Sequence, residues 1–521
     1  MSRTIDVALK KVKKLVEFQD YATAKNILNE AINKHPNNPR LKALSDSVAS
    51  KIDRPIAPTI KIPSQEIIRE LSSLCDESEW TTLITRCFEI LSIDEDMPLV
   101  WNFLGLAQRA NGMPRLAEVS HKHAVALDPN FYGAYTNLGN VLKDLKKYEE
   151  SIAYQKKAIA LSPTDYKPLN NLGTLYEDIG MFDDASESFE QALKIDPGNA
   201  TAEYNLGSVS LRHKDFKNGW RQRERRWERD SSEQEAPLET SKPAWDGSQA
   251  GRLFVWAEQG VGDEIMFGSC FEDLLSRCDE LIVSTSERIL PLFERSFTDR
   301  ATFVSRFSPL PEDLYDVQSP MLSALGFLRQ DQSDFKPAAK PYLVADEKKI
   351  EILRGALEGP SGGKPIVGLS WFSQNKTYGK RRSLALEQIA ERIPKDCFLV
   401  NLQYGDVNDE ISQVAKKLGR NIANFGNVDN WMHLDSLAAL ITVCDKVVSI
   451  DNSTAHFAGA LGKESHILLP YSADWRWGTS EGTSSYWYSS TNLYWQSELD
   501  NWNGPLLSLE ETLMTKKNSP G

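Results

Sequence analysis

The segment Phe131–Pro163, FYGAYTNLGNVLKDLKKYEESIAYQKKAIALSP, decides the fold of the first part of the chain, because its pattern recurs along the sequence. The small residues Gly139 and Ala158 and the proline Pro163 each belong to a series spaced by 34 residues. Small residues let two antiparallel helices approach closely, and a proline blocks continuation of the second helix. The three series are Gly105, Gly139, Gly173 and Gly207, then Ala124, Ala158 and Ala192, then Pro129, Pro163 and Pro197.

This period, with these residue types, resembles the tetratricopeptide repeat (TPR) family. We therefore predict an N-terminal TPR α-solenoid, with an array over 64–230 and a degenerate unit over 1–51. A proline-marked linker, Asp53–Pro58, lies between them, and the aromatic, basic end Gly219–Trp227 is interpreted as a capping or docking helix. TPR solenoids have a concave groove that binds extended peptides, so we expect a protein or peptide partner.

An asparagine recurs with the repeat, at Asn137, Asn171 and Asn205, in three copies of N-L-G. The period places these side chains in register on the first helix of each unit. Such a ladder can donate to and accept from a peptide backbone without reading its sequence. We predict that the three asparagines bind the acceptor. The alternative is that asparagine is simply common at this TPR position.

After the polar segment Glu228–Gly251, which is predicted to be a linker, the pattern changes to short apolar runs separated by helical stretches. This alternation predicts parallel sheets with crossover helices. We expect two Rossmann-like domains, over 252–357 and 364–515, with a hinge at Glu358–Gly363 and a ligand cleft at the carboxyl ends of the strands. The predicted strands are Leu253–Trp256, Leu281–Val283, Thr302–Val304, Ile366–Leu369, Phe398–Val400, Val447–Ile450 and His466–Leu469.

A glycine-rich turn, EQGVGDE, follows the first predicted strand at Glu258–Glu264. Gly260 and Gly262 let the backbone turn tightly and approach a ligand, and Asp263 would enter the next helix facing the cleft. The dinucleotide-binding pattern is incomplete, because Ile265 stands where its third glycine would be. The alternative for Asp263 is a helix-capping carboxylate.

A second polar turn, DNSTAHFAGALG, follows the strand that ends at Ile450 and occupies Asp451–Gly462. The amides and dipole at a helix start favour an anion. The hydroxyls of Ser453 and Thr454 add donors, and His456 would reach a phosphate or ribose. We predict that Asp451, Ser453, Thr454, Ala455 and His456 bind the donor. The alternative for His456 is a packed helix residue.

Two further motifs follow strand ends. Ser370 precedes a basic cluster that can neutralise a diphosphate, and Gln403 and Tyr404 lie where a nucleobase can stack. We include Ser370, Gln403 and Tyr404 in the predicted donor site, together with the two arginines of the cluster. The cluster consists of Lys376, Lys380, Arg381 and Arg382.

Together the motifs GVGD, LQYGD and DNSTAHFAGALGK resemble the GT-B glycosyltransferases related to bacterial heptosyltransferases. The whole chain looks like bacterial TPR–glycosyltransferase fusions, some similar in layout to flagellin-modifying transferases and protein O-GlcNAc transferase. The resemblance implies a nucleotide-sugar donor held mainly by the C-terminal half, and Asp263 as general base. Asn452-Ser453-Thr454 departs from the small-residue run of the heptosyltransferases, so the donor need not be a heptose.

Composition narrows the alternatives. The net charge of -13 argues against nucleic-acid binding. No secretory leader or membrane-length apolar run is evident, and the scattered cysteines are typical of a cytoplasmic protein. The sole D-x-D, Asp94–Asp96, lies in the repeats, so we expect a metal-independent enzyme without a cofactor. The alternatives are a non-catalytic scaffold that binds a nucleotide, or a polysaccharide or lipid acceptor.

Overall fold

The computed structural model describes residues 9, 11–13, 21–36, 38–52, 64–229, 236–335, 340–375, 378–426, 428–479 and 482–515. The predicted linker Asp53–Pro58 and Lys376 lie outside them. The chain divides into two compact units, Met1–Leu127 and Asp128–Gly521. In the part of the chain that is described, no helix has the length and apolar character needed to cross a membrane.

The first unit contains helix pairs only, among its described residues. Between α6 and α7, Gly105 faces the ring of His121, and a side chain on Gly105 would collide with that ring. Burial lowers the pKa of His121 to about 3, so its ring is neutral at pH 7. The helices are α2 (Tyr21–Lys34), α3 (Pro39–Ile52), α4 (Ser64–Asp76), α5 (Trp80–Leu91), α6 (Pro98–Ala110) and α7 (Pro114–Leu127).

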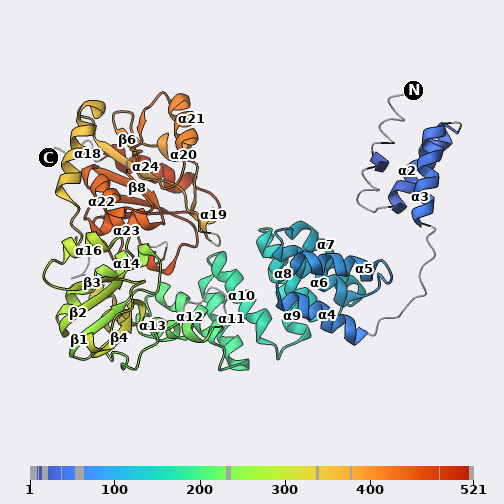
Figure 1. Ribbon diagram of the computed structural model, residues 1–521, viewed down its shortest axis with the longest axis horizontal. Helices are drawn as coiled ribbons and strands as arrows, with labels where there is room; N and C mark the ends of the chain where they lie inside the picture. Colours follow the sequence, from blue (N-terminus) through green and yellow to red (C-terminus); the bar gives the residue numbers. More distant parts are fainter. Residues whose placement is uncertain are drawn as a thin grey trace. The chain divides into compact units, whose positions relative to one another are not determined.

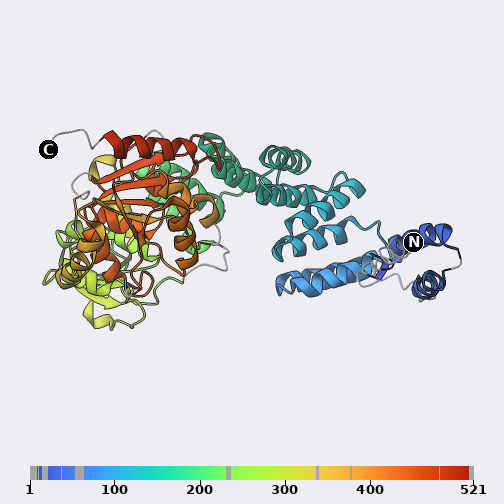
Figure 2. The same cartoon turned by 90° about the horizontal axis from the view of Figure 1, so that it is seen from above.

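The second unit begins with three more helix pairs, which stack on one another (Figures 1 and 2). They confirm the helix-pair prediction, and a short 3-10 helix, η1 (Glu224–Glu228), follows the last pair. The pairs are α8 (Tyr132–Asp144) with α9 (Tyr148–Leu161), α10 (Tyr166–Asp178) with α11 (Phe182–Ile195), and α12 (Ala200–Arg212) with α13 (Phe216–Arg223).

The repeated glycines are explained by a recurring contact. A Cβ atom built on each would lie 2.5–2.9 Å from the side chain of the residue 16 positions later, which comes from the second helix of the same pair. The repeated alanines Ala124, Ala158 and Ala192 are fully buried. The contacting side chains are those of His121, Gln155, Phe189 and Arg223.

Two parallel sheets follow (Figure 1). The first has the strand order β3-β2-β1-β4, with Val255 opposite Val283 of β2 and Ser319 of β4. Its strands are β1 (Ala250–Trp256), β2 (Cys278–Thr285), β3 (Thr302–Ser305) and β4 (Val317–Pro320). Its helices are α14 (Val261–Gly268), α15 (Phe271–Leu275), α16 (Leu290–Ser296), α17 (Met321–Leu328) and α18 (Glu347–Ser361), with η2 (Glu312–Leu314) and η3 (Gln332–Phe335).

The second sheet has the order β10-β9-β8-β5-β6-β7, all parallel. Its strands are β5 (Ile366–Ser370), β6 (Phe398–Asn401), β7 (Ile422–Ala423), β8 (Lys446–Ile450), β9 (Glu464–Leu469) and β10 (Thr491–Trp495). Its helices are α19 (Gly379–Arg382), α20 (Leu386–Ala390), α21 (Asn408–Leu418), α22 (Leu434–Val443), α23 (Ser453–Ala460) and α24 (Asn503–Thr515), with η4 (Trp475–Trp477). All seven predicted strands are present.

Two predicted connections differ from the expectation. The hinge Glu358–Gly363 is mostly the last turn of α18, which contains Pro360 and ends at Gly362 in the left-handed conformation, with φ 59°. A proline in the last turn removes only one hydrogen bond of the helix, and glycine adopts the left-handed conformation of the C-cap without strain. The predicted linker Glu228–Gly251 has a packed second part, because Trp245 is buried and its amide donates to Gln318 of β4 at 2.7 Å.

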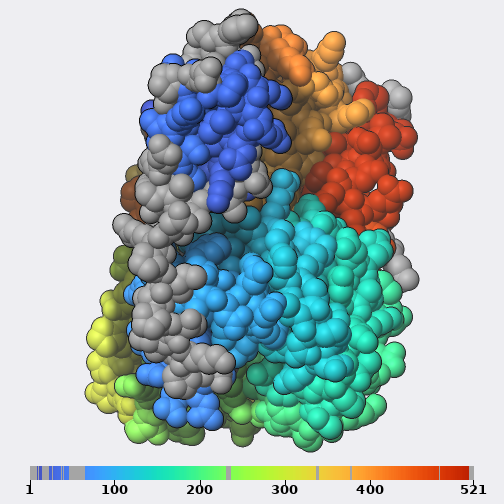
Figure 3. Space-filling model, turned by 90° about the vertical axis from the view of Figure 1, so that its right-hand side faces the viewer, coloured from blue at the N-terminus to red at the C-terminus, as the bar shows by residue number. Residues whose placement is uncertain are grey.

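The last helix pair shares its core with the sheets. Leu211, Phe216 and Trp220 belong to one buried apolar cluster with residues of both sheets, and the Trp220 indole donates to the carbonyl of Arg329 at 2.6 Å. The segment Gly219–Trp227, predicted to be a capping or docking helix, is the end of α13 followed by η1, and its Trp220 packs in this shared core. Lys146, between α8 and α9, forms an ion pair with Asp500 at 2.6 Å. In Figure 3 red atoms of the C-terminal part of the chain border the blue-green repeat helices.

Candidate functional site

A cavity of about 1160 Å³ opens in the second unit, where the repeats and both sheets meet. It is lined by residues of α10 and α12 and by the segments that follow β1, β5, β6, β8 and β9. The carboxyl ends of both sheets therefore face one space, as predicted for ligand sites of parallel sheets. The predicted site residues among its lining are Gly260, Gly262, Asp263, Arg381, Arg382, Tyr404, Asp451, Ser453, His456 and Asn205.

The segment after β1 brings the first sheet to the second. Gly262 lies so close to α23 that a Cβ on it would be 3.2 Å from Cδ2 of His456 and 3.6 Å from the Cα atom of Ser453. Gly260 is the N-cap of α14, and Asp263 lies in the first turn without capping the helix. The capping alternative for Asp263 therefore does not hold. Its carboxylate forms an ion pair with Arg476, and its side chain is 25% exposed.

Two neighbouring glutamates hold this segment in place. Glu264 is buried and accepts hydrogen bonds from Thr285 at 2.5 Å and from the Ser286 amide at 2.8 Å. Burial raises the pKa of Glu264. Glu258 accepts from Arg226 of the repeat cap at 2.8 and 3.1 Å. Both glutamates lie in the EQGVGDE turn, yet nothing in the motif distinguishes these buried positions from the partly exposed Asp263.

The turn before α23 is fixed by a chain of buried hydrogen bonds. Asn452 caps α23 by accepting from the Thr454 amide at 3.0 Å, and it donates to Ser370 at 2.8 Å. Ser370 in turn donates to Gln403 at 3.1 Å, and Gln403 also accepts from the amides of Trp371 and Phe372 at 2.9 Å. The side chains of Ser370 and Gln403 are thus buried and already hydrogen-bonded. Thr454, whose amide is bonded to Asn452, and Ala455 are also buried.

His456 is 5% exposed and faces the cavity from α23. Its Nδ1 lies 3.0 Å from the Tyr488 hydroxyl, and its ring stacks on Trp477 with centroids 5.1 Å apart. Burial lowers the pKa of His456 to about 4, although Asp451 opposes the shift, so the ring is neutral at pH 7. A neutral imidazole can donate to a phosphate or hydroxyl without contributing a charge.

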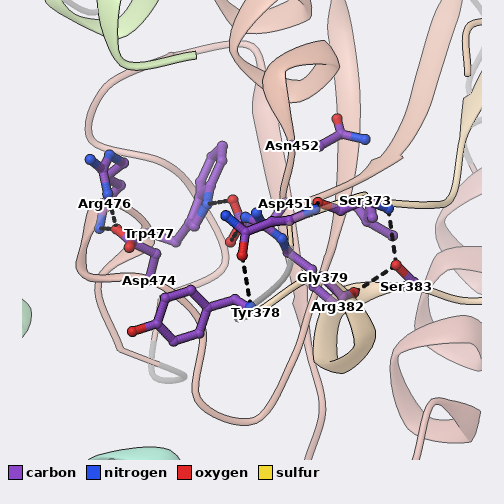
Figure 4. A network of polar contacts seen from close by, with 12 residues as sticks. Ser373, Tyr378, Gly379, Arg382, Ser383, Asp451, Asn452, Asp474, Arg476 and Trp477 are labelled. Carbon is purple, nitrogen blue, oxygen red and sulfur yellow. Dashed lines mark hydrogen bonds and ion pairs between the residues drawn. The ribbon is translucent and has the colours of Figure 1, made fainter. Parts of the chain in front are cut away.

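Two arginines of the predicted basic cluster have different surroundings. Arg381 binds Asp178 of α10 through both terminal nitrogens, at 2.6 and 2.9 Å. Arg382 lies 3.3 Å from Asp451, whose other oxygen accepts from the Trp477 indole at 2.7 Å. Figure 4 shows Arg382 and Asp451 on one side of Trp477, with the Arg476–Asp474 pair on the other.

An aromatic group lines the cavity beyond β6. The ring of Tyr404 lies 5.4 Å from that of Trp431, and the guanidinium of Arg288 lies over Trp431 at 4.5 Å. Trp431 is 49% exposed, which leaves part of its surface open to a planar ligand. Sequence reasoning missed Trp431 and Arg288. A lone tryptophan in the polar segment 424–433 was the available signal.

The asparagine ladder reaches the cavity at one end. Asn205 lines it and donates to Asn170 at 3.3 Å, rather than to Asn171. Asn137, Asn171 and Asn205 are all partly buried. Among the described residues, no group of three His, Cys, Asp or Glu side chains gathers to hold a metal ion, and Asp94–Asp96 occupies an exposed turn between α5 and α6.

Known proteins resemble parts of this chain. A tetratricopeptide-repeat family model matches residues 131–198. Protein FlbA of Caulobacter vibrioides is 30% identical over 278 residues, which cover 50% of this chain and 46% of that protein, so the chain spans less than half the length of this relative. MamA is 23% identical (30% of this chain, 97% of that chain, TM-score 0.28), and a thermophilic TPR protein of Thermus thermophilus is 19% identical (32% and 92%, TM-score 0.30). The chain therefore carries TPR repeats, a protein-interaction module, joined to a parallel-sheet α/β region.

Proposed function

We propose that this chain is a metal-independent, cytoplasmic glycosyltransferase that moves a sugar from a nucleotide-sugar donor to a protein or peptide bound by the repeats. The observation that carries the proposal is the meeting of three parts in one cavity. Asp263 of α14, the α23 start with Ser453 and His456, and Asn205 of the repeats all line it. A base, an anion site and a partner-binding surface are the parts that such a transfer needs.

In this proposal the two sheets form a GT-B pair. The donor diphosphate lies at the α23 start, where helix dipole, Ser453 and Arg382 offset its charge. The nucleobase stacks beside Tyr404 and Trp431, whose rings border the cavity. Asp263 accepts the proton of the acceptor hydroxyl, for which base catalysis typically contributes about 10²–10⁴-fold.

A transfer assay tests the proposal. The full-length protein is incubated with a panel of labelled nucleotide sugars and protein extract from the source cell, and label in protein is measured beside release of nucleotide. We expect one donor to label protein, and Asp263→Asn to abolish labelling. Asp316→Asn, which alters a carboxylate that is bound by Arg252 and does not line the cavity, serves as the control and should retain labelling. Labelling by Asp263→Asn at the wild-type rate would contradict the assignment of the base.

The second candidate is a scaffold that binds a nucleotide without turnover, since repeats alone serve as docking modules. It predicts nucleotide binding in calorimetry without release of nucleotide from any sugar donor. The exposed fraction of Asp263 and its place in the cavity favour the enzyme, because a scaffold has no need of a carboxylate there.

A further inference from the structure

Arg476 lies between two carboxylates that come from different sheets. Its Nη1 donates to Asp474 at 2.6 Å, and its Nη2 forms the ion pair with Asp263. Its guanidinium also lies over the Trp475 ring at 4.5 Å. The side chain is 13% exposed and borders the cavity. Arg476 is therefore the cation in direct contact with the proposed base.

The two carboxylates hold Arg476 differently. Asp474 lies two residues away in the same turn and also accepts from the Arg476 amide at 3.1 Å, so this contact is local and anchors the side chain. Asp263 belongs to α14 of the first sheet, and its carboxylate faces the open cavity. Rotation at the Nη2 end alone would break the contact with Asp263 while the Asp474 contact remains.

The same turn also contacts the proposed phosphate site. Trp477, next to Arg476, donates to Asp451 before α23 and stacks on His456 within that helix. The charge of Arg476 acts on His456 as well. An anion at the start of α23 would therefore lie within the field of Arg476, whose Nε has no hydrogen-bond partner in the described part of the chain.

We propose that Arg476 exchanges partners during the reaction: it neutralises Asp263 in the empty cavity and binds the donor diphosphate once that anion arrives. The inference rests on the proposed transfer reaction. A carboxylate oxygen that accepts from a guanidinium has fewer lone pairs available for a substrate proton. Donor binding thus frees the base, and the acceptor hydroxyl meets an active Asp263 only when sugar is present.

The step balances as follows. The acceptor oxygen forms a bond to the anomeric carbon, and the bond from that carbon to the donor phosphate oxygen breaks. The hydroxyl proton passes to Asp263, and the electron pair leaves with the nucleoside diphosphate. Arg476, anchored by Asp474, neutralises part of that added charge. After the diphosphate departs, Asp263 releases its proton to solvent and Arg476 returns to the ionised carboxylate.

Calorimetry on the full-length protein tests the exchange. The probes are inorganic pyrophosphate and ADP, GDP, UDP, CDP and dTDP, and the tightest binder to the wild type is carried through the variants. Arg476→Gln should weaken binding about ten- to hundredfold. Asp263→Asn should tighten it about tenfold, because Arg476 no longer has to leave a carboxylate.

The decisive comparison is Asp263→Asn in the Arg476→Gln background. In that background the gain in affinity from Asp263→Asn should be no more than about twofold, since the substitution removes only a negative charge that is distant from the bound anion. An equal gain in both backgrounds, or no gain in the wild type, overturns the exchange while leaving the proposed function standing. Arg476→Lys keeps the charge and should preserve the gain, which guards against a misfolded Gln variant. If no probe binds the wild type, the proposed donor site and the exchange both fail.

Discussion

Arg381 of α19 donates hydrogen bonds through both terminal nitrogens to Asp178 at the end of repeat helix α10, at 2.6 and 2.9 Å. Lys143 of α8 lies 3.1 Å from the same carboxylate, so two repeats and the second sheet share one charge cluster. Next to it, the Ser472 hydroxyl donates to the carbonyl of Glu177 at 2.6 Å. These contacts fix the repeats to the segment that carries Arg476.

Because Arg381 is bound by Asp178, we expect substitutions of Arg381 and of its neighbour Arg382 to have different effects. Arg381→Gln should lower the free energy of unfolding by about 1–3 kcal/mol, because Asp178 is mostly buried and keeps only Lys143. Its affinity for a nucleoside diphosphate should hardly change. Arg382→Gln should instead weaken that affinity about tenfold. Urea unfolding and calorimetry on both variants check this, and a similar loss of affinity in Arg381→Gln would assign the phosphate to Arg381.

Gln403 is expected to matter for stability rather than for recognition. Gln403→Ala would leave the buried amide of Trp371 and the partly buried amide of Phe372 without an acceptor, at a cost of about 2–4 kcal/mol. Tyr404→Ala is the matched variant next to it and should be less destabilising. It should weaken nucleotide binding, since base stacking on an aromatic ring contributes about 1–3 kcal/mol. A Gln403→Ala variant as stable as the wild type would show that the Gln403 network is dispensable.

The lowered pKa of His456 predicts that the protein loses stability in mild acid. Its pKa in the folded protein is about 4, below the ordinary value of 6.5, so the unfolded chain takes up the proton first. Stability from this group is complete above pH 6.5 and falls as the pH drops towards 4. Between pH 7 and pH 5 the loss is about 2 kcal/mol.

The measurement compares wild type with His456→Gln by urea unfolding at both pH values. The variant should lose about 2 kcal/mol less than the wild type over this range. His121, whose pKa is also lowered, is present in both proteins and cancels from the comparison. If both proteins lost the same free energy of unfolding between pH 7 and pH 5, His456 would have the same pKa in the folded and the unfolded protein, which would contradict the prediction.

The shared core predicts where the chain can be cut. A fragment that begins at Leu253 lacks Phe216, Trp220 and Trp245, so its apolar surface should be exposed and the fragment should aggregate. A fragment that begins at Asp128 retains α8–α13 and should fold and bind a diphosphate as the full chain does. Within the full chain, Trp220→Ala should cost about 3–5 kcal/mol. Circular dichroism melts and calorimetry distinguish these outcomes, and a well-folded Leu253 fragment would contradict them.

Periodicity made the helix pairs predictable, and apolar runs made seven strands predictable. Three strands were missed: β4 contains Gln318, Ser319 and Pro320, β7 has only two residues, and β10 follows Thr491 and Asn492 with only a short apolar run. Pairing with a buried neighbour, which the local sequence does not encode, makes them strands. The packing of Trp245 on β4 has the same origin.

The sequence predicted that the candidate site lies at the ends of the strands. It did not predict which of the polar side chains there are bonded within the protein and which are open to a ligand. Ser370, Gln403 and Arg381 carry the residue types of ligand-binding groups, yet each is satisfied by a partner far away in the sequence. Arg476 was overlooked because its two acidic partners come together only through the fold. Which polar residue stays free is decided by tertiary contacts.

The glycine contacts between paired helices also bear on how such arrays change length. Each repeated glycine and the side chain that packs against it lie 16 residues apart within one 34-residue repeat, called a block here. A block therefore contains both residues of the contact, and the space beside each glycine is the hollow that the side chain fills. Duplication or deletion of a whole block keeps every hollow filled, whereas recombination inside a block would mismatch Gly173 with His121 or Gln155 in place of Phe189. The final block is not interchangeable in this way, because its Phe216 and Trp220 pack in one core with residues of the sheets. Because Asp178 and Lys146 also contact the C-terminal part of the chain, engineering of the array should insert or remove whole blocks ahead of α8.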